Sequence, residues 1–210
     1  STPLSSNCYL RESIPTSTSL HAIGKSNITD IFAKASSAEE LFSISKRFTT
    51  SLATCSIVDY ILGIHATSRS PKDIRLSTRN GEVYMTGFDL FELVKASETN
   101  LAHSVPFRLT RDIVGLIGDR NLAGVMPAVM RAAADAVNKK ATSFAEYLEL
   151  LNLQEDQSHS ENFSERIRDL LGDDNDSEAS IYSGINGLIE ESMNTANLAN
   201  VQPKHFSAWL

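Results

Sequence analysis

Residues 36–64 read SSAEELFSISKRFTTSLATCSIVDYILGI, and this stretch decides the fold. It opens with a doubled capping-box pattern, because Ser36 and Ser37 each stand three residues before a Glu. The stretch predicts a long, largely buried helix over 38–63 that Gly63 ends. Apolar residues recur along it with helical spacing and fall on one face: Leu41, Ile44, Phe48, Leu52, Cys55 and Leu62.

A polar loop over 65–73 and then a short β-hairpin are predicted after this helix. Strands are expected over 74–77 and 82–86, and Arg79-Asn80-Gly81 lies between them. Asn-Gly favours a tight hairpin turn because both residues tolerate positive φ angles.

Further helices are predicted beyond the hairpin. Thr110 is expected to cap the first of them, Gly118 to end it, and Pro127 to fit into the first turn of the second. The predicted ranges are 111–117, 124–137, 144–151, 163–171, 181–193 and 196–201. The fold class is therefore mainly α with a small β-hairpin.

Two segments show no sustained apolar period. Residues 1–35 are rich in Ser and Thr and are predicted to be irregular. Between Glu155 and Glu178 nine residues are acidic and two are basic, which accounts for the whole net charge of −7 because the rest balances at 17 against 17. This run predicts a solvated linker. The chain is therefore divided into 1–35, 36–152, 153–180 and 181–210.

Composition and motifs exclude several classes of function. The chain has no basic stripe, so no direct contact with nucleic acid is expected. It has no apolar run of the roughly 20 residues that span a bilayer, so no membrane partner is expected. Five scattered His and two Cys residues give no metal-ligand spacing, and neither a Walker loop nor a dinucleotide fingerprint is present. No metal and no cofactor are therefore predicted.

Four segments in order resemble the kinase region of the phosphatidylinositol 3-kinase-related kinases. Residues 51–64 are similar to the helix that leads into the catalytic loop, and 81–84 to the strand before the metal-binding Asp. Val105-Pro-Phe-Arg-Leu-Thr-Arg-Asp-Ile113 closely matches the end of the family's activation loop. Residues 187–192 and 197–199, with the aromatic tip, are similar to the terminal FATC module. The resemblance implies the carboxy-terminal lobe of a protein-kinase-like fold with a helical FATC tail.

The same resemblance implies that the catalytic residues are lost. Active members follow the helix with Gly-Asp-Arg-His and a later Asn, whereas here 65–72 contain no Asp and Asp73 stands near the Asn position. Where the family has Asp-Phe-Gly, this chain has Gly87-Phe88-Asp89, so Gly87 replaces the metal-chelating Asp. The sequence thus predicts a pseudokinase whose degenerate positions are Asp73, Gly87 and Asp89.

The resemblance implies a structural role for two sets of residues. Pro106, Phe107, Arg108 and Leu109 return the chain from the activation loop to the helical lobe, with Arg108 expected to meet a carboxylate or carbonyl. The terminal Phe206, Trp209 and Leu210 are expected to fold against the lobe together with the helices before them.

A biological role also follows from the resemblance. The non-catalytic branch of the family implies a nuclear scaffold subunit of SAGA-type histone acetyltransferase complexes. Its partners would be the other subunits of such a complex, and transcription activators bound through regions outside this chain. Two alternatives stay open: a divergent but active serine/threonine kinase, and a free-standing regulator that shares the fold.

Overall fold

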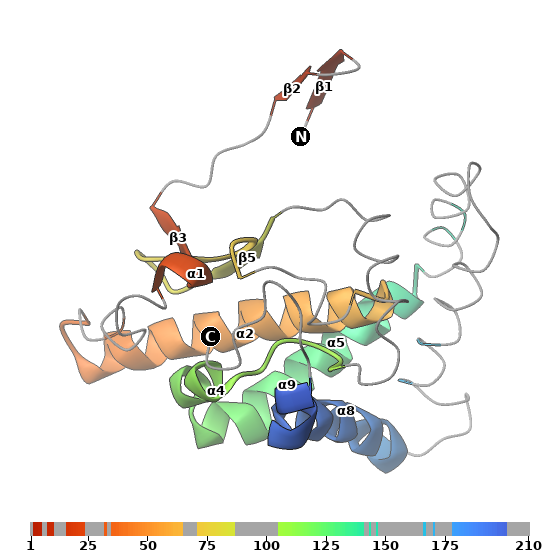
Figure 1. Ribbon diagram of the computed structural model, residues 1–210. Helices are drawn as coiled ribbons and strands as arrows, with labels where there is room; N and C mark the ends of the chain where they lie inside the picture. The colour runs from red at the N-terminus through yellow and green to blue at the C-terminus, as the bar shows by residue number, and fades with distance from the viewer. Residues whose placement is uncertain are drawn as a thin grey trace.

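A computed structural model describes residues 2–5, 8–10, 16–23, 32, 35–64, 71–86, 105–140, 143, 146, 166, 170 and 178–200. The longest element is the helix α2 (Ala38–Ile61), which runs through the middle of the molecule (Figure 1). Its start follows the capping pattern, since the Ser37 side chain accepts a hydrogen bond from the Glu40 amide at 3.1 Å. The Glu40 carboxylate reaches back one residue beyond the cap and accepts from the Ser36 amide and hydroxyl.

A three-stranded antiparallel sheet lies against one side of α2, in the order β3-β4-β5. The predicted hairpin is confirmed as β4 (Ile74–Ser77) and β5 (Val83–Met85), with Leu76 opposite Val83. In its turn only Gly81 has a positive φ, of 78°. A Cβ at this position would lie 2.6 Å from Ile44 Cγ2 on α2, so Gly81 also allows a close approach of the turn to the helix.

The third strand corrects the expectation that 1–35 is irregular. β3 (Ser17–Ser19) pairs with β4, and Arg75 donates hydrogen bonds to the Ser17 hydroxyl and carbonyl. It leads into the short helix α1 (Leu20–Ile23), whose two end residues are buried in the core. Farther upstream, β1 (Thr2–Ser5) and β2 (Cys8–Leu10) form a separate hairpin. Ser17-Thr18-Ser19 suits a loop as well as a strand, and pairing with β4 selects the strand.

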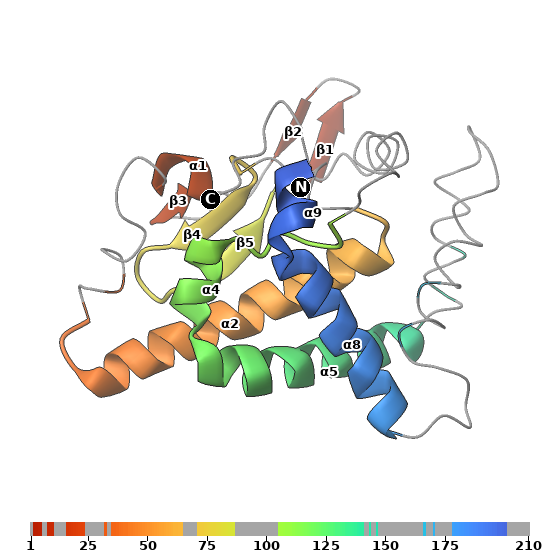
Figure 2. The same ribbon diagram turned by 60° about the horizontal axis from the view of Figure 1, so that its bottom comes forward.

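The helices α4 (Arg111–Ile117) and α5 (Met126–Asn138), with the π-helical turn η3 (Asn121–Val125) between them, cover the other side of α2 (Figure 2). The last two helices are α8 (Glu178–Met193) and α9 (Thr195–Asn200), and α9 packs on α8. α2 therefore packs between the sheet and α5, and α8 packs on α5. One hydrophobic core joins these layers, with Phe48, Ile57, Leu76, Ile113 and Met130 among its buried residues.

Three details of the helices differ from the sequence-based prediction. Leu41 was placed on the buried face of α2 but is 44% exposed, because the first turn of the helix extends beyond the elements that cover it. Thr110 precedes α4, yet its side chain makes no capping hydrogen bond and its Oγ1 atom is buried without one. The second helix begins at Asn121 rather than 124, through η3, where Asn121 donates to Ser45 Oγ and to the Ile117 carbonyl at 3.0 Å.

The other predicted helices are confirmed where the structure describes their residues. Gly118 ends α4 with a φ of 73°, and Pro127 lies in the first turn of α5. The helices predicted over 144–151 and 163–171 lie almost wholly outside the described residues. Among the described residues no single helix has the length and apolarity to cross a membrane; one pair bent by 92°, Arg111–Ile117 with Asn121–Asn138, passes on length and composition.

Candidate functional site

The ends of β4 and β5 meet where the resemblance places the metal-binding residues of active kinases. Asp73 immediately precedes β4, and Thr86 immediately follows β5. The Thr86 amide donates to the Asp73 carbonyl at 2.8 Å, and the Thr86 hydroxyl donates to the same oxygen at 3.1 Å. Both side chains are partly buried. The hairpin therefore brings one carboxylate and one hydroxyl to this edge of the sheet.

Of the three positions predicted to be degenerate, the structure describes Asp73. Gly87 and Asp89 lie outside the described residues, as does 65–70, the place of the catalytic loop. α2 leads to that loop through a compact turn, in which the Gly63 amide donates to the Tyr60 carbonyl and the Ile64 amide to the Asp59 carbonyl. No group of three or more His, Cys, Asp or Glu side chains gathers as a metal site in the part of the chain that the structure describes.

The segment Val105–Thr110 is buried throughout, including Pro106, Phe107 and Leu109. Arg108 is 4% exposed, and burial lowers its pKa from the ordinary value to about 10, so it remains a cation at neutral pH. A cation so far from water is costly unless its surroundings compensate it. The segment is buried, and both its structural role and the acceptor expected beneath Arg108 remain predictions.

The helical tail contacts this buried segment directly. The Phe107 amide donates a long hydrogen bond of 3.4 Å to the hydroxyl of Ser192 in α8, and Ser192 is fully buried. Apolar residues of α8 and α9 also lie inward, because Ile189 and Leu198 are buried and Leu188 and Met193 pack partly buried against the core. Phe206, Trp209 and Leu210 lie outside the described residues, so their packing remains a prediction.

Sequence reasoning missed one contact at the end of α2. Gly63 has a φ of 77°, and the space that its Cβ would fill is taken by the guanidinium group of Arg166. Its Cζ would lie 2.8 Å and its Nη2 3.0 Å from that Cβ. α2 has no basic residue in its last turn, so Arg166 brings a cation to the negative end of the helix dipole. The sequence held one weak signal: Arg166 is one of two basic residues in the acidic run.

Comparison with known proteins places this geometry in a family. The family model described as phosphatidylinositol 3- and 4-kinase matches residues 24–156. The serine/threonine-protein kinase mTor of Drosophila melanogaster is 33% identical over 99 residues, which are 45% of this chain and 4% of that protein. The serine/threonine-protein kinase ATM of the same fly is 33% identical over 105 residues, or 50% of this chain and 4% of that protein.

Solved structures agree with these relatives. The structure described as the FAT and kinase domain of CtTel1 has a TM-score of 0.64 and 25% identity, covering 87% of this chain and 13% of that one. The complete CtTel1 dimer has a TM-score of 0.66 at the same identity. The described helices and sheet are thus those of a kinase-like carboxy-terminal lobe, and the chain spans a small part of each relative's length. The family match covers more than half of this chain's residues, and the chain therefore belongs to the phosphatidylinositol 3- and 4-kinase family.

Proposed function

We propose that this chain is a non-catalytic portion of a large scaffold protein. The observation that carries the proposal is the edge formed by Asp73 and Thr86. The family's metal-binding Asp follows the strand equivalent to β5, and the residues that follow β5 here are Thr86 and Gly87. Whichever of the two occupies that place, neither carries a carboxylate.

A missing carboxylate after β5 matters because phosphoryl transfer depends on bound metal ions. The transferred group reacts through a loose transition state, and catalysis depends on positioning and on metal ions that neutralise the phosphate oxygens. Magnesium binds carboxylate oxygens and substrate phosphates in such sites. Residues 65–72 also lack an Asp to orient the acceptor hydroxyl, so the base and the chelating group are absent together. Asp73 alone supplies a single carboxylate.

A more specific identity rests on the resemblance. TRRAP and its fungal counterpart share the family fold without its catalytic residues, and this chain resembles them in Arg69-x-Pro71, in the segment 106–110 and in the terminal Trp-Leu. We infer a nuclear scaffold subunit of SAGA-type histone acetyltransferase complexes.

An active kinase is the second candidate, favoured by one observation: two of the relatives are named serine/threonine-protein kinases. Incubation of the full-length protein with magnesium and labelled ATP separates the candidates. Asp73→Ala and the exposed Asp119→Ala serve as matched variants. The scaffold proposal predicts no transfer by any of the three proteins. A magnesium-dependent signal that Asp73→Ala removes and Asp119→Ala retains would establish the kinase instead.

The scaffold role has its own test, which is independent of phosphotransfer. The full-length protein should co-purify from nuclear extract with acetyltransferase subunits in a large assembly. Recovery as a free protein, with no such subunits, would contradict the role and would favour a free-standing regulator.

A further inference from the structure

Asn-Gly occurs twice in this chain, at Asn80-Gly81 and at Asn186-Gly187. Asparagine is a chemically labile residue, and a glycine after it leaves its own amide nitrogen open to approach because it carries no Cβ. The first pair lies in the turn between β4 and β5, and the second lies in the middle of α8. The two pairs therefore offer the same chemistry in two different backbone conformations.

The turn holds the Asn80 side chain against the backbone that follows it. The Glu82 amide donates to Asn80 Oδ1 at 3.2 Å, which folds the side chain back over Gly81. The same amide would stabilise negative charge on Oδ1 if a nucleophile added to Cγ. The Gly81 amide donates to the Ser77 carbonyl at 3.1 Å, and it must leave this bond before its nitrogen can react.

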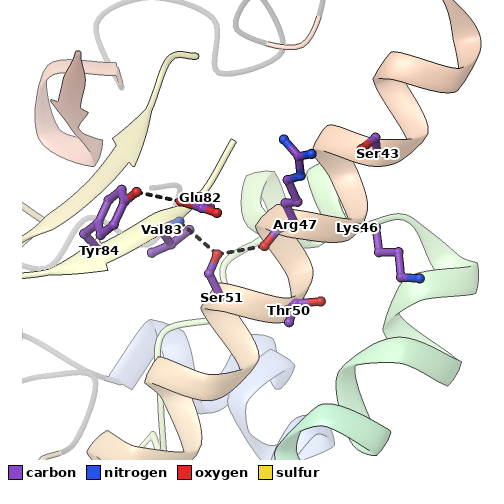
Figure 3. A pocket seen from close by; sticks show the side chains of 8 residues that line it. All are labelled: Ser43, Lys46, Arg47, Thr50, Ser51, Glu82, Val83 and Tyr84. Atoms are coloured by element: carbon purple, nitrogen blue, oxygen red, sulfur yellow. Dashed lines mark hydrogen bonds between the residues drawn. The ribbon is translucent and has the colours of Figure 1, made fainter. Parts of the chain in front are cut away.

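Water reaches this turn. The Asn80 side chain is partly exposed. β5 and α2 also line an open cavity of about 360 Å³ beside Lys46, and Glu82 and Tyr84 lie in its wall (Figure 3). The Tyr84 hydroxyl donates to the Glu82 carboxylate at 2.6 Å and is the main reason why the pKa of Glu82 lies below its ordinary value; a hydrogen bond from the Asn80 side chain lowers it further. The Asn80 amide group is therefore held between polar groups of Glu82, within reach of solvent.

The helix gives Asn186 a different setting, although this side chain is more exposed than that of Asn80. In an α-helix the Gly187 amide donates to the carbonyl four residues earlier, and turns of helix on both sides keep it there. Several hydrogen bonds of α8 must break together to release that amide, whereas a turn at the end of a hairpin can open locally. Exposure alone would favour reaction at Asn186, and the backbone favours Asn80.

We propose that Asn80 deamidates spontaneously in the folded chain and that the product loosens the hairpin from α2. The Gly81 amide nitrogen gives its proton to hydroxide and attacks Cγ of Asn80, so a new N–C bond closes a succinimide ring. The Cγ–Nδ2 bond breaks, and Nδ2 leaves as ammonia after taking a proton from water, which regenerates hydroxide. Water then opens the ring at either carbonyl to give aspartate or isoaspartate. The net reaction consumes water and releases ammonia, and it does not depend on whether the chain transfers phosphate.

Isoaspartate lengthens the backbone of the turn, because its main chain runs through the former side chain and gains a methylene group. The turn fits closely on α2, since a Cβ at Gly81 would lie 2.6 Å from Ile44 Cγ2. A longer backbone here moves Gly81 relative to Ile44 and disturbs the bond of 2.8 Å from the Ser77 amide to the Glu82 carbonyl. The product also places a second negative charge beside the Glu82 carboxylate. The end of the hairpin should therefore become less ordered.

Ageing of the full-length protein at neutral pH tests the proposal. Peptide mass spectrometry after pepsin digestion at low pH follows the conversion of both Asn-Gly pairs, in native buffer and in concentrated urea. The two pairs should convert at similar rates in urea, because neither keeps its fold there. In native buffer Asn80 should convert about tenfold faster than Asn186 or more, because several helical hydrogen bonds protect Asn186. Electron-transfer fragmentation identifies isoaspartate in the product.

Asn80→Gln is the matched control, since it keeps a neutral amide and its longer side chain closes the corresponding ring much more slowly. Hydrogen exchange of the β4–β5 peptides should become faster in the aged native protein and should stay unchanged in aged Asn80→Gln. Asn186→Gln should show the same conversion at Asn80, and the same faster exchange, as the native protein.

Three results would overturn the proposal. The first is conversion of Asn186 in native buffer at least as fast as that of Asn80. The second is an unconverted Asn80 in native buffer after a time in which urea converts it fully, which would show that the bond from Gly81 to Ser77 withholds the nucleophile. The third is converted Asn80 with unchanged hydrogen exchange, which would reject the loosening of the hairpin.

Discussion

Ser51 on α2 accepts a hydrogen bond from the backbone amide of Val83, the first residue of the edge strand β5. The same hydroxyl donates to the Arg47 carbonyl at 2.8 Å, so it connects the helix backbone to the sheet edge. Edge strands present unpaired amides that invite pairing with other chains. Here a helix side chain satisfies one of them.

Ser51→Ala is expected to destabilise the fold by about 1–2 kcal/mol, because the buried Val83 amide loses its acceptor. Urea unfolding followed by circular dichroism measures the change. Thr54→Ala is the matched control, since the exposed Thr54 hydroxyl donates only to the Thr50 carbonyl within the helix. Equal unfolding midpoints for the two variants would show that Ser51 does not hold the sheet.

Gly81→Ala is expected to cost about 1–3 kcal/mol, because a residue with a Cβ is strained at this positive φ and its Cβ would press on Ile44. Gly187→Ala provides the contrast within the same chain. Nothing lies within 4 Å of a Cβ there, and Ala in a helix stabilises by about 0.5–1 kcal/mol relative to Gly. Thermal melting should therefore shift in opposite directions, and a shift of both variants in the same direction would contradict this account.

Arg108→Ala is expected to lower stability by about 2–4 kcal/mol, since it empties a buried site and removes the packing of a long side chain. The pH dependence has a definite sign. Burial lowers the pKa of Arg108 to about 10, so the folded chain holds this proton less tightly than the unfolded chain. The native chain should gain stability relative to Arg108→Met as the pH rises through 10. No change in that difference between pH 8 and 11 would refute the assigned cause.

Glu40 provides a test at low pH. Hydrogen bonds from the Ser36 hydroxyl and amide lower the pKa of Glu40 below its ordinary value. The resulting stabilisation is present above that ordinary value and is lost as the pH falls through the lowered one. Ser36→Ala should raise the pKa of Glu40 toward its ordinary value, as followed by NMR titration.

The sequence predicted most of the described framework because that framework depends on local signals. The cap at Ser37, the Asn-Gly turn and Pro127 each act within a few residues, and each lies where the pattern indicated. β3 was missed because nothing local distinguishes Ser17–Ser19 from a loop. Pairing with β4, nearly 60 positions away, decides its conformation. Leu41 was misassigned because periodicity identifies the face of a helix, but not how far along the helix its cover extends.

The candidate site was predicted less completely, for a related reason. The pattern located Asp73 and the buried segment around Arg108, both of which follow from short motifs. It did not identify Thr86 as the residue opposite Asp73, because strand register fixes that pairing. The sequence could not predict the cavity beside Lys46 either, because that cavity exists only where the hairpin packs on α2.

The contact between Gly63 and Arg166 predicts how the two positions vary together in evolution. If backbone conformation were the sole constraint, Asn could replace Gly63, because Asn tolerates a positive φ. A side chain at 63 would displace the guanidinium group, which is the end of a flexible side chain, so a relative that keeps this contact should also retain Gly63. A relative with a small residue at 166 is free to carry Asn at 63. Positions 63 and 166 should therefore leave a shared signature across homologous sequences, although 103 positions separate them (166 − 63).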